Sequence, residues 1–129
     1  MMTTELTMLV YTVILTFVVI SVPAVFSILQ NGLATQAGPR DDLPEPTAFV
    51  KRARRLQDNL VENMVLFVPL VLAVQVAGLN DAATAAGAQL FFGARVIHAL
   101  IYWAGVPWVR PLAWAVSLVG LVMIAWPLL

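Results

Sequence analysis

The sequence predicts an all-α fold, an integral membrane four-helix bundle. Of the 129 residues, 61% are hydrophobic and only 11% are charged, whereas a soluble domain is typically about 45–50% apolar and about 25% charged. A membrane-spanning helix needs about 20 mostly apolar residues, and the chain holds four such runs with short connections. Nothing is left for a separate soluble domain, so we expect a single membrane domain over residues 1–129.

The first predicted span covers residues 8–29, which carry no charge and include Pro23 as a site for a kink. Residues 30–50 are polar and rich in Gly and Pro, which predicts a loop. Thr47 is a suitable N-cap for one helix that begins with charged turns and continues into the second span, residues 57–77.

The third predicted span covers residues 82–104 and follows a tight turn at Gly78. It is apolar apart from a few polar side chains, among them Arg95 and His98, and it ends at a Gly-Val-Pro segment. The fourth predicted span covers residues 110–126. Gln75 is predicted to hydrogen-bond to a neighbouring helix, and the glycines at positions 87 and 93 are predicted to allow close helix contact.

The charges of the chain predict its orientation. Seven Lys and Arg balance seven Asp and Glu, so no basic surplus is available for a nucleic-acid backbone, and we expect no nucleic-acid partner. Six of the basic residues lie around the first and third connections, which fall on one side of the bundle: Arg40, Lys51, Arg52, Arg54, Arg55 and Arg110. The positive-inside rule places that side in the cytoplasm and both termini outside the cytoplasm. Lys51, Arg52 and Arg54 are interpreted as a headgroup-binding and orienting cluster.

Polar side chains form one stripe on each of the two middle helices. The stripe on the second helix has the spacing i, i+4, i+7 and consists of Arg55, Asn59 and Glu62. The stripe on the third helix has the spacing i, i+3, i+7 and consists of Arg95, His98 and Tyr102. Side chains at these spacings share one helix face, and charges inside a bilayer are expensive. We therefore expect both stripes to face protein, with Glu62 and Arg95 as an ion pair.

The sequence allows two interpretations of these stripes. The polar side chains can act as membrane glue between helices, or they can form a polar pocket near the cytoplasmic end. Arginines with a carboxylate and an amide suit an anionic, peptide-like small molecule, and a hydrophobic co-substrate can enter from the lipid. A lone His98 with one nearby Glu falls short of a metal-ligand set, so we expect no metal and a hydrogen-bonded role for His98. Zero cysteines also remove thiolate metal sites.

The segments RRLQDNLVEN and GARVIHALIYWAG resemble two motifs of the MAPEG family, the membrane-associated proteins of eicosanoid and glutathione metabolism. The first resembles the R-x-x-x-N-x-x-E signature of that family, at Arg55, Asn59 and Glu62. The second resembles its R-x-x-H-x-x-x-Y pattern, at Arg95, His98 and Tyr102. The resemblance covers nearly the whole chain, including its length, its number of spans and its long first loop.

The resemblance implies a homotrimer in the lipid bilayer, with glutathione as co-substrate bound between adjacent subunits toward the cytoplasmic side. It also implies that the six residues of the two motifs line the glutathione site. Family members stabilise the glutathione thiolate with an arginine at the start of the fourth helix, and Arg110 stands at the matching place. A guanidinium beside a thiol favours the reactive anion.

Three positions depart from the prostaglandin E synthase branch of the family. Asp58 replaces an arginine before the Asn, Pro111 replaces a serine, and Trp114 replaces a tyrosine. Each change removes a contact to glutathione or its thiol, and Asp58 would repel a substrate carboxylate if it faced the site. Arg110 remains as the thiol activator.

The leading hypothesis is a glutathione-dependent transferase or peroxidase in a bacterial inner membrane, acting on a lipophilic electrophile or hydroperoxide. One alternative is a non-catalytic membrane module that keeps the ligand pocket. Another is a small four-span transporter in which Glu62 couples proton and substrate movement, although pairing with Arg95 would make Glu62 a poor proton carrier.

Overall fold

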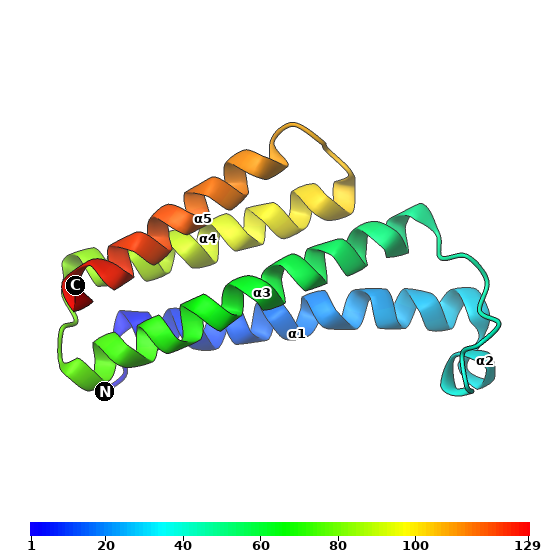
Figure 1. Ribbon diagram of the computed structural model, residues 1–129, viewed down its shortest axis with the longest axis horizontal. Coiled ribbons are helices and arrows are strands. Elements are labelled where there is room, and N and C mark those ends of the chain that lie inside the picture. The colour runs from blue at the N-terminus through cyan, green and yellow to red at the C-terminus, as the bar shows by residue number, and fades with distance from the viewer.

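The computed structural model describes residues 1–129 and confirms the predicted all-α fold of four long helices (Figure 1). The long helices are α1 (Thr4–Asn31), α3 (Ala48–Ala77), α4 (Ala82–Ala104) and α5 (Arg110–Ala125). A short α2 (Leu33–Ala37) lies in the first loop, and a 3₁₀ turn, η1 (Trp126–Leu128), ends the chain. Four helices, with η1 counted in the last, are long and apolar enough to cross a membrane.

The helices run up and down, with α1 beside α3 and α4 beside α5 (Figure 1). Both termini and the turn between α3 and α4 lie at one end of the bundle (Figure 1). The first loop with α2 and the connection between α4 and α5 lie toward the other end. The two basic connections therefore share one end, which we call the loop end.

The helix boundaries follow from local capping chemistry. The hydroxyl of Thr47 accepts a hydrogen bond from the backbone N–H of Val50, which confirms the predicted N-cap of α3. Gly78 ends α3 with φ +68°, a left-handed conformation that favours glycine. Asp81 and Thr84 form a capping box that starts α4.

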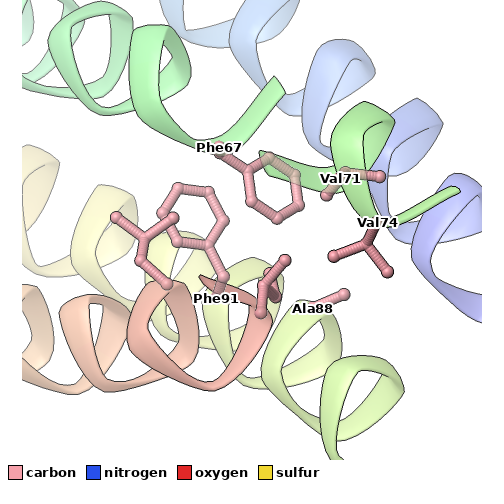
Figure 2. Packing of buried hydrophobic residues seen from close by; sticks show 7 residues of the cluster. Phe67, Val71, Val74, Ala88 and Phe91 are labelled. Carbon is pink, nitrogen blue, oxygen red and sulfur yellow. The ribbon is translucent and has the colours of Figure 1, made fainter. Parts of the chain in front are cut away.

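The largest apolar cluster joins α3, α4 and α5 in the half of the bundle nearer the termini (Figure 2). Its centre is the stacked pair Phe67 and Phe91, whose ring centroids lie 4.1 Å apart. The cluster consists of Phe67, Val71, Val74, Ala88, Phe91, Leu121 and Ile124. All seven side chains are buried, so this cluster fixes how the α4–α5 pair sits on α3.

The backbones of α4 and α5 meet at two glycines. A Cβ atom on Gly120 would lie 2.6 Å from the carbonyl oxygen of Gly87, and a Cβ atom on Gly87 would lie 2.8 Å from that of Gly120. The predicted close contact at Gly87 is thus confirmed, with Gly120 as the partner. Gly93 has no atom within 4 Å of such a Cβ position, so the corresponding prediction for Gly93 is wrong within the chain.

Polar contacts tie the start of α1 to the other helices. Glu5 is buried and accepts a hydrogen bond from the hydroxyl of Thr84 on α4. The hydroxyl of Thr3 donates to Gln75 Oε1 on α3 over 2.8 Å, which supplies the predicted interhelical bond of Gln75. A buried carboxylate without such a donor would be strongly unfavourable, so these contacts fix the position of α1.

The three basic residues at the start of α3 have different surroundings, although the sequence grouped them. Lys51 pairs with Glu45 in the first loop and lowers the pKa of that carboxyl. Arg52 is half-buried, donates to the carbonyl oxygen of Trp103 over 3.4 Å and lies against Gly105. A cation there stabilises the C-terminal end of α4. Arg54 lines a cavity beside α1.

Candidate functional site

A pocket of about 240 Å³ opens at the loop end between α3, α4 and α5. It is lined by Asn59, His98, Tyr102, Arg110, Pro111 and Trp114. Four of these six residues are predicted site residues, and the other two are the departures noted at the start of α5. The fold therefore brings the second stripe and the start of α5 together with Asn59.

Asn59 connects the pocket to a buried arginine. Arg95 is 1% exposed, and its Nη2 donates to Asn59 Oδ1 over 2.7 Å. Asn63, one turn further along α3, is also buried and donates from Nδ2 to the carbonyl oxygen of Asn59 over 2.8 Å. Sequence reasoning missed Asn63, although its spacing of four residues from Asn59 marks the same face.

The predicted ion pair between Glu62 and Arg95 is wrong, because Glu62 is exposed and the only ion pair in the chain joins Lys51 and Glu45. The reason is helix geometry. The buried face of α3 includes Leu56, Leu60 and Asn63, each one position after a residue of the predicted stripe. One residue turns the helix by about 100°, so the stripe lies on the flank of the buried face. Only Asn59 reaches α4 from that flank.

The two ends of the first motif face outward. Arg55 and Glu62 are both exposed and neither lines the pocket. Asp58 is exposed as well and lines a different cavity, beside α1. The repulsion between Asp58 and a substrate carboxylate, expected if Asp58 faced the site, therefore does not arise in this pocket.

One wall of the pocket is formed by two aromatic rings on α4, those of His98 and Tyr102, and by Arg110 on α5. His98 is 2% exposed, and its ring meets the ring of Tyr102 edge-on, with centroids 5.0 Å apart. The guanidinium carbon of Arg110 lies 4.9 Å from the centre of the Tyr102 ring. A cation over an aromatic face is attracted by the negative face of the ring, so Tyr102 orients Arg110 at the mouth of the pocket.

Several buried polar atoms near the pocket have no hydrogen-bond partner within the chain. They are Nε and Nη1 of Arg95 and Nδ1 of His98. No carboxylate lines the pocket, while Arg110 contributes a positive charge. This arrangement suits an anionic ligand that offers hydrogen-bond acceptors. No group of three His, Cys, Asp or Glu side chains is placed to hold a metal ion.

Replacing Asn59 with leucine is expected to lower the free energy of unfolding by about 2 kcal/mol. The substitution removes the only acceptor of the Arg95 guanidinium and leaves a buried charge unsatisfied. The midpoint of thermal unfolding in detergent micelles measures this loss. Asn59→Asp keeps an acceptor for Arg95 and is expected to retain most of the stability. Equal losses in both variants would contradict the role assigned to this hydrogen bond.

A comparison with models of known protein families matches the MAPEG family over residues 6–129, nearly the whole chain. No curated protein matches the chain, and no solved structure matches it. The family match agrees with four helices of span length, so the chain is an integral, multi-pass membrane protein.

Proposed function

The chain belongs to the MAPEG family, and from that premise we propose that it is a membrane-embedded enzyme that uses glutathione against a lipophilic electrophile or hydroperoxide. The observation that carries the proposal is the pocket at the loop end. It combines the positive charge of Arg110 with hydrogen-bonding groups from Asn59, His98 and Tyr102. Glutathione is a peptide-like anion with a thiol, and this set of groups suits its carboxylates and its thiolate.

The proposed chemistry places the glutathione sulfur beside Arg110. The guanidinium stabilises the thiolate, and the thiol proton leaves to solvent. With an electrophile, the thiolate forms a C–S bond and the displaced group departs with the bonding electron pair. With a hydroperoxide, two glutathione molecules are oxidised to the disulfide, while the hydroperoxide is reduced to an alcohol and water. Proximity of thiolate and lipophilic partner supplies much of the remaining rate enhancement.

The outer flank of α3 supports a further part of the proposal, assembly as a homotrimer. Glu62 lies in the apolar part of α3 and is exposed on the surface of the chain. A charged side chain facing lipid costs about 2.5–3.5 kcal/mol at the centre of a span on insertion scales, and less toward the end of the span, where Glu62 lies. Covering this flank with another copy of the chain removes that cost and brings Arg55 and Glu62 into an interface between subunits. We place these two residues at the same glutathione site, contributed across that interface.

A second candidate function is binding without catalysis. Pro111 and Trp114 line the pocket where related enzymes carry hydroxyl groups, so Arg110 alone is left to activate a thiol. In this alternative, the chain binds glutathione or another thiol in the membrane and does not catalyse its reaction. We further propose that the pocket faces the cytoplasm of a bacterial cell, because both basic connections lie at the loop end.

The test is turnover by detergent-purified protein. Glutathione would be supplied with chlorodinitrobenzene as electrophile in one assay and with cumene hydroperoxide in the other. The proposal predicts saturable, glutathione-dependent turnover in at least one assay. Glutathione binding without turnover in both assays would favour the non-catalytic module. Absence of both binding and turnover would overturn both candidate functions.

A further inference from the structure

A stripe of residues along α4 faces away from the rest of the bundle, and we call it the outer stripe. On one side of it, Gly87 and Phe91 lie against α5. On the other side, the ring of Phe92 meets the ring of Tyr11 on α1, with centroids 5.8 Å apart. The outer stripe consists of Ala86, Gln89, Gly93, Ile97, Leu100 and Ala104. Residues spaced by three and four share one helix face, and this face carries no charge.

Gln89 is the one polar side chain of the outer stripe, and it is exposed about two turns inside α4 from its start at Ala82. Two side chains of α4 form hydrogen bonds within the chain, those of Thr84 and Arg95. The amide of Gln89 therefore has no partner in its own chain. Lipid tails offer no partner either, and an unpaired amide in hydrocarbon is unfavourable. A partner for Gln89 must come from outside the chain.

Gly93 marks the point of the outer stripe where a second backbone can approach. A Cβ atom at Gly93 would have no other atom within 4 Å, whereas Cβ atoms at Gly87 and Gly120 would meet backbone of the neighbouring helix. Packing inside the chain therefore does not require glycine at position 93. Glycine weakens a helix relative to alanine, but in membranes small residues let neighbouring helices pack closely. Ala86, one turn before Gln89, is small as well.

The outer stripe lies on the opposite side of α4 from α3 and from the pocket. Arg95 bonds to Asn59 on α3, and it follows Gly93 by two residues, which turn a helix by about 200°. The proposed contact between subunits through Arg55 and Glu62 lies on the side of α3. That contact leaves the outer stripe uncovered.

We propose that the outer stripe packs against the outer stripe of a second copy of this chain, with the two Gln89 amides hydrogen-bonded to each other. Every copy inserts with the same orientation, so the two-fold axis between two copies runs along the membrane normal. Equivalent residues then lie at the same depth, and a residue beside the axis meets its own equivalent. An amide suits this position because it carries both N–H donors and an acceptor oxygen. A lipid acyl chain carries neither.

Disulfide crosslinking in native membranes tests this contact, because the chain contains no cysteine of its own. Ala86→Cys places a thiol on the outer stripe. Val119→Cys is the matched control: Val119 is exposed on α5, next to Gly120, which approaches Gly87 and Phe91 on either side of Gln89 in the sequence. With copper phenanthroline as oxidant, Ala86→Cys is expected to form a covalent dimer about tenfold faster than Val119→Cys, because a disulfide requires closely placed Cα atoms.

Three further substitutions, each combined with Ala86→Cys, separate the contributions of the outer stripe. Gln89→Leu removes the amide and is expected to lower the rate of dimer formation about tenfold. Gly93→Leu fills space that is open within the chain and is expected to abolish the dimer, while gel filtration in detergent shows that the variant is folded. Glu62→Gln lies on the flank of α3 and is expected to leave the dimer unchanged, so the two proposed contacts can fail separately.

Three results would overturn the proposal. The first is equal crosslinking of Ala86→Cys and Val119→Cys, which would indicate random collision of copies in the membrane. The second is an unchanged rate of dimer formation in Gln89→Leu, which would leave the amide without the assigned role. The third is a crosslinked product whose mass shows a different protein, which would assign the outer stripe to another membrane partner.

Discussion

Gly120→Ala is expected to separate α4 from α5 and to lower the free energy of unfolding by about 3 kcal/mol or more. The added Cβ atom would lie 2.6 Å from the carbonyl oxygen of Gly87 and 2.9 Å from the backbone nitrogen of Phe91. Both contacts are with backbone, which cannot move aside as the end of a flexible side chain can. The helices must shift apart, and the stacked pair of Phe67 and Phe91 next to this contact loses its packing.

The matched control is Gly93→Ala on α4. Nothing lies within 4 Å of a Cβ atom at Gly93, and alanine stabilises a helix by about 0.5–1 kcal/mol relative to glycine. Thermal unfolding in detergent, with gel filtration to measure the monodisperse fraction, separates the two variants. Similar midpoints for Gly120→Ala and Gly93→Ala would contradict the close approach of α4 and α5.

Arg110→Ala is expected to lower kcat for glutathione conjugation by about 100- to 1,000-fold. Losing one group that stabilises a developing or reacting anion has effects of this size in other enzymes. Arg110 is the only charged residue that lines the pocket, so no second cation replaces it. The thiol of bound glutathione should then ionise nearer its ordinary pKa, and the rise of rate with pH should move to higher pH.

Arg110→Lys and Lys51→Ala complete this experiment. Lysine keeps the positive charge but loses the planar guanidinium that lies over Tyr102, so its kcat should fall between those of the unaltered protein and Arg110→Ala. Lys51→Ala removes an exposed cation that does not line the pocket and should leave kcat unchanged. An unaltered kcat and pH profile in Arg110→Ala would show that Arg110 does not activate the thiol.

Much of the fold follows from short-range signals that are visible in the sequence. Apolar runs of span length mark the helices. The hydroxyl of Thr47 marks where α3 begins, and the conformational freedom of Gly78 marks where it ends. The contact at Gly120 was not predicted, because a glycine inside an apolar span looks the same whether it faces lipid or a neighbouring backbone. The buried carboxylate of Glu5 was missed for a similar reason, since its donor, Thr84, is distant in sequence.

For the candidate site as well, the sequence predicts which residues share a helix face but not how the helices pack against one another. Spacing on α4 predicted that His98 and Tyr102 share a face, and they line one pocket with Arg110. Spacing on α3 predicted that Arg55, Asn59 and Glu62 face protein, but Arg55 and Glu62 are exposed within the chain. Spacing does not fix the rotation of the helix toward α4, and each residue along a helix is turned by about 100° from the one before it. That rotation decides that Asn59, rather than Glu62, meets Arg95. It is set by the packing of Leu56 and Leu60, which the stripe itself does not specify.

Calorimetric titration of glutathione into detergent-purified protein measures directly whether the pocket at the loop end binds glutathione. The unaltered protein, Asn59→Asp, Arg110→Ala and Lys51→Ala would be titrated in parallel. We expect saturable binding to the unaltered protein, weaker binding to Asn59→Asp and Arg110→Ala, and unchanged binding to Lys51→Ala. Absence of binding at millimolar glutathione, or binding that neither pocket variant weakens, would contradict the assignment of this pocket as the glutathione site.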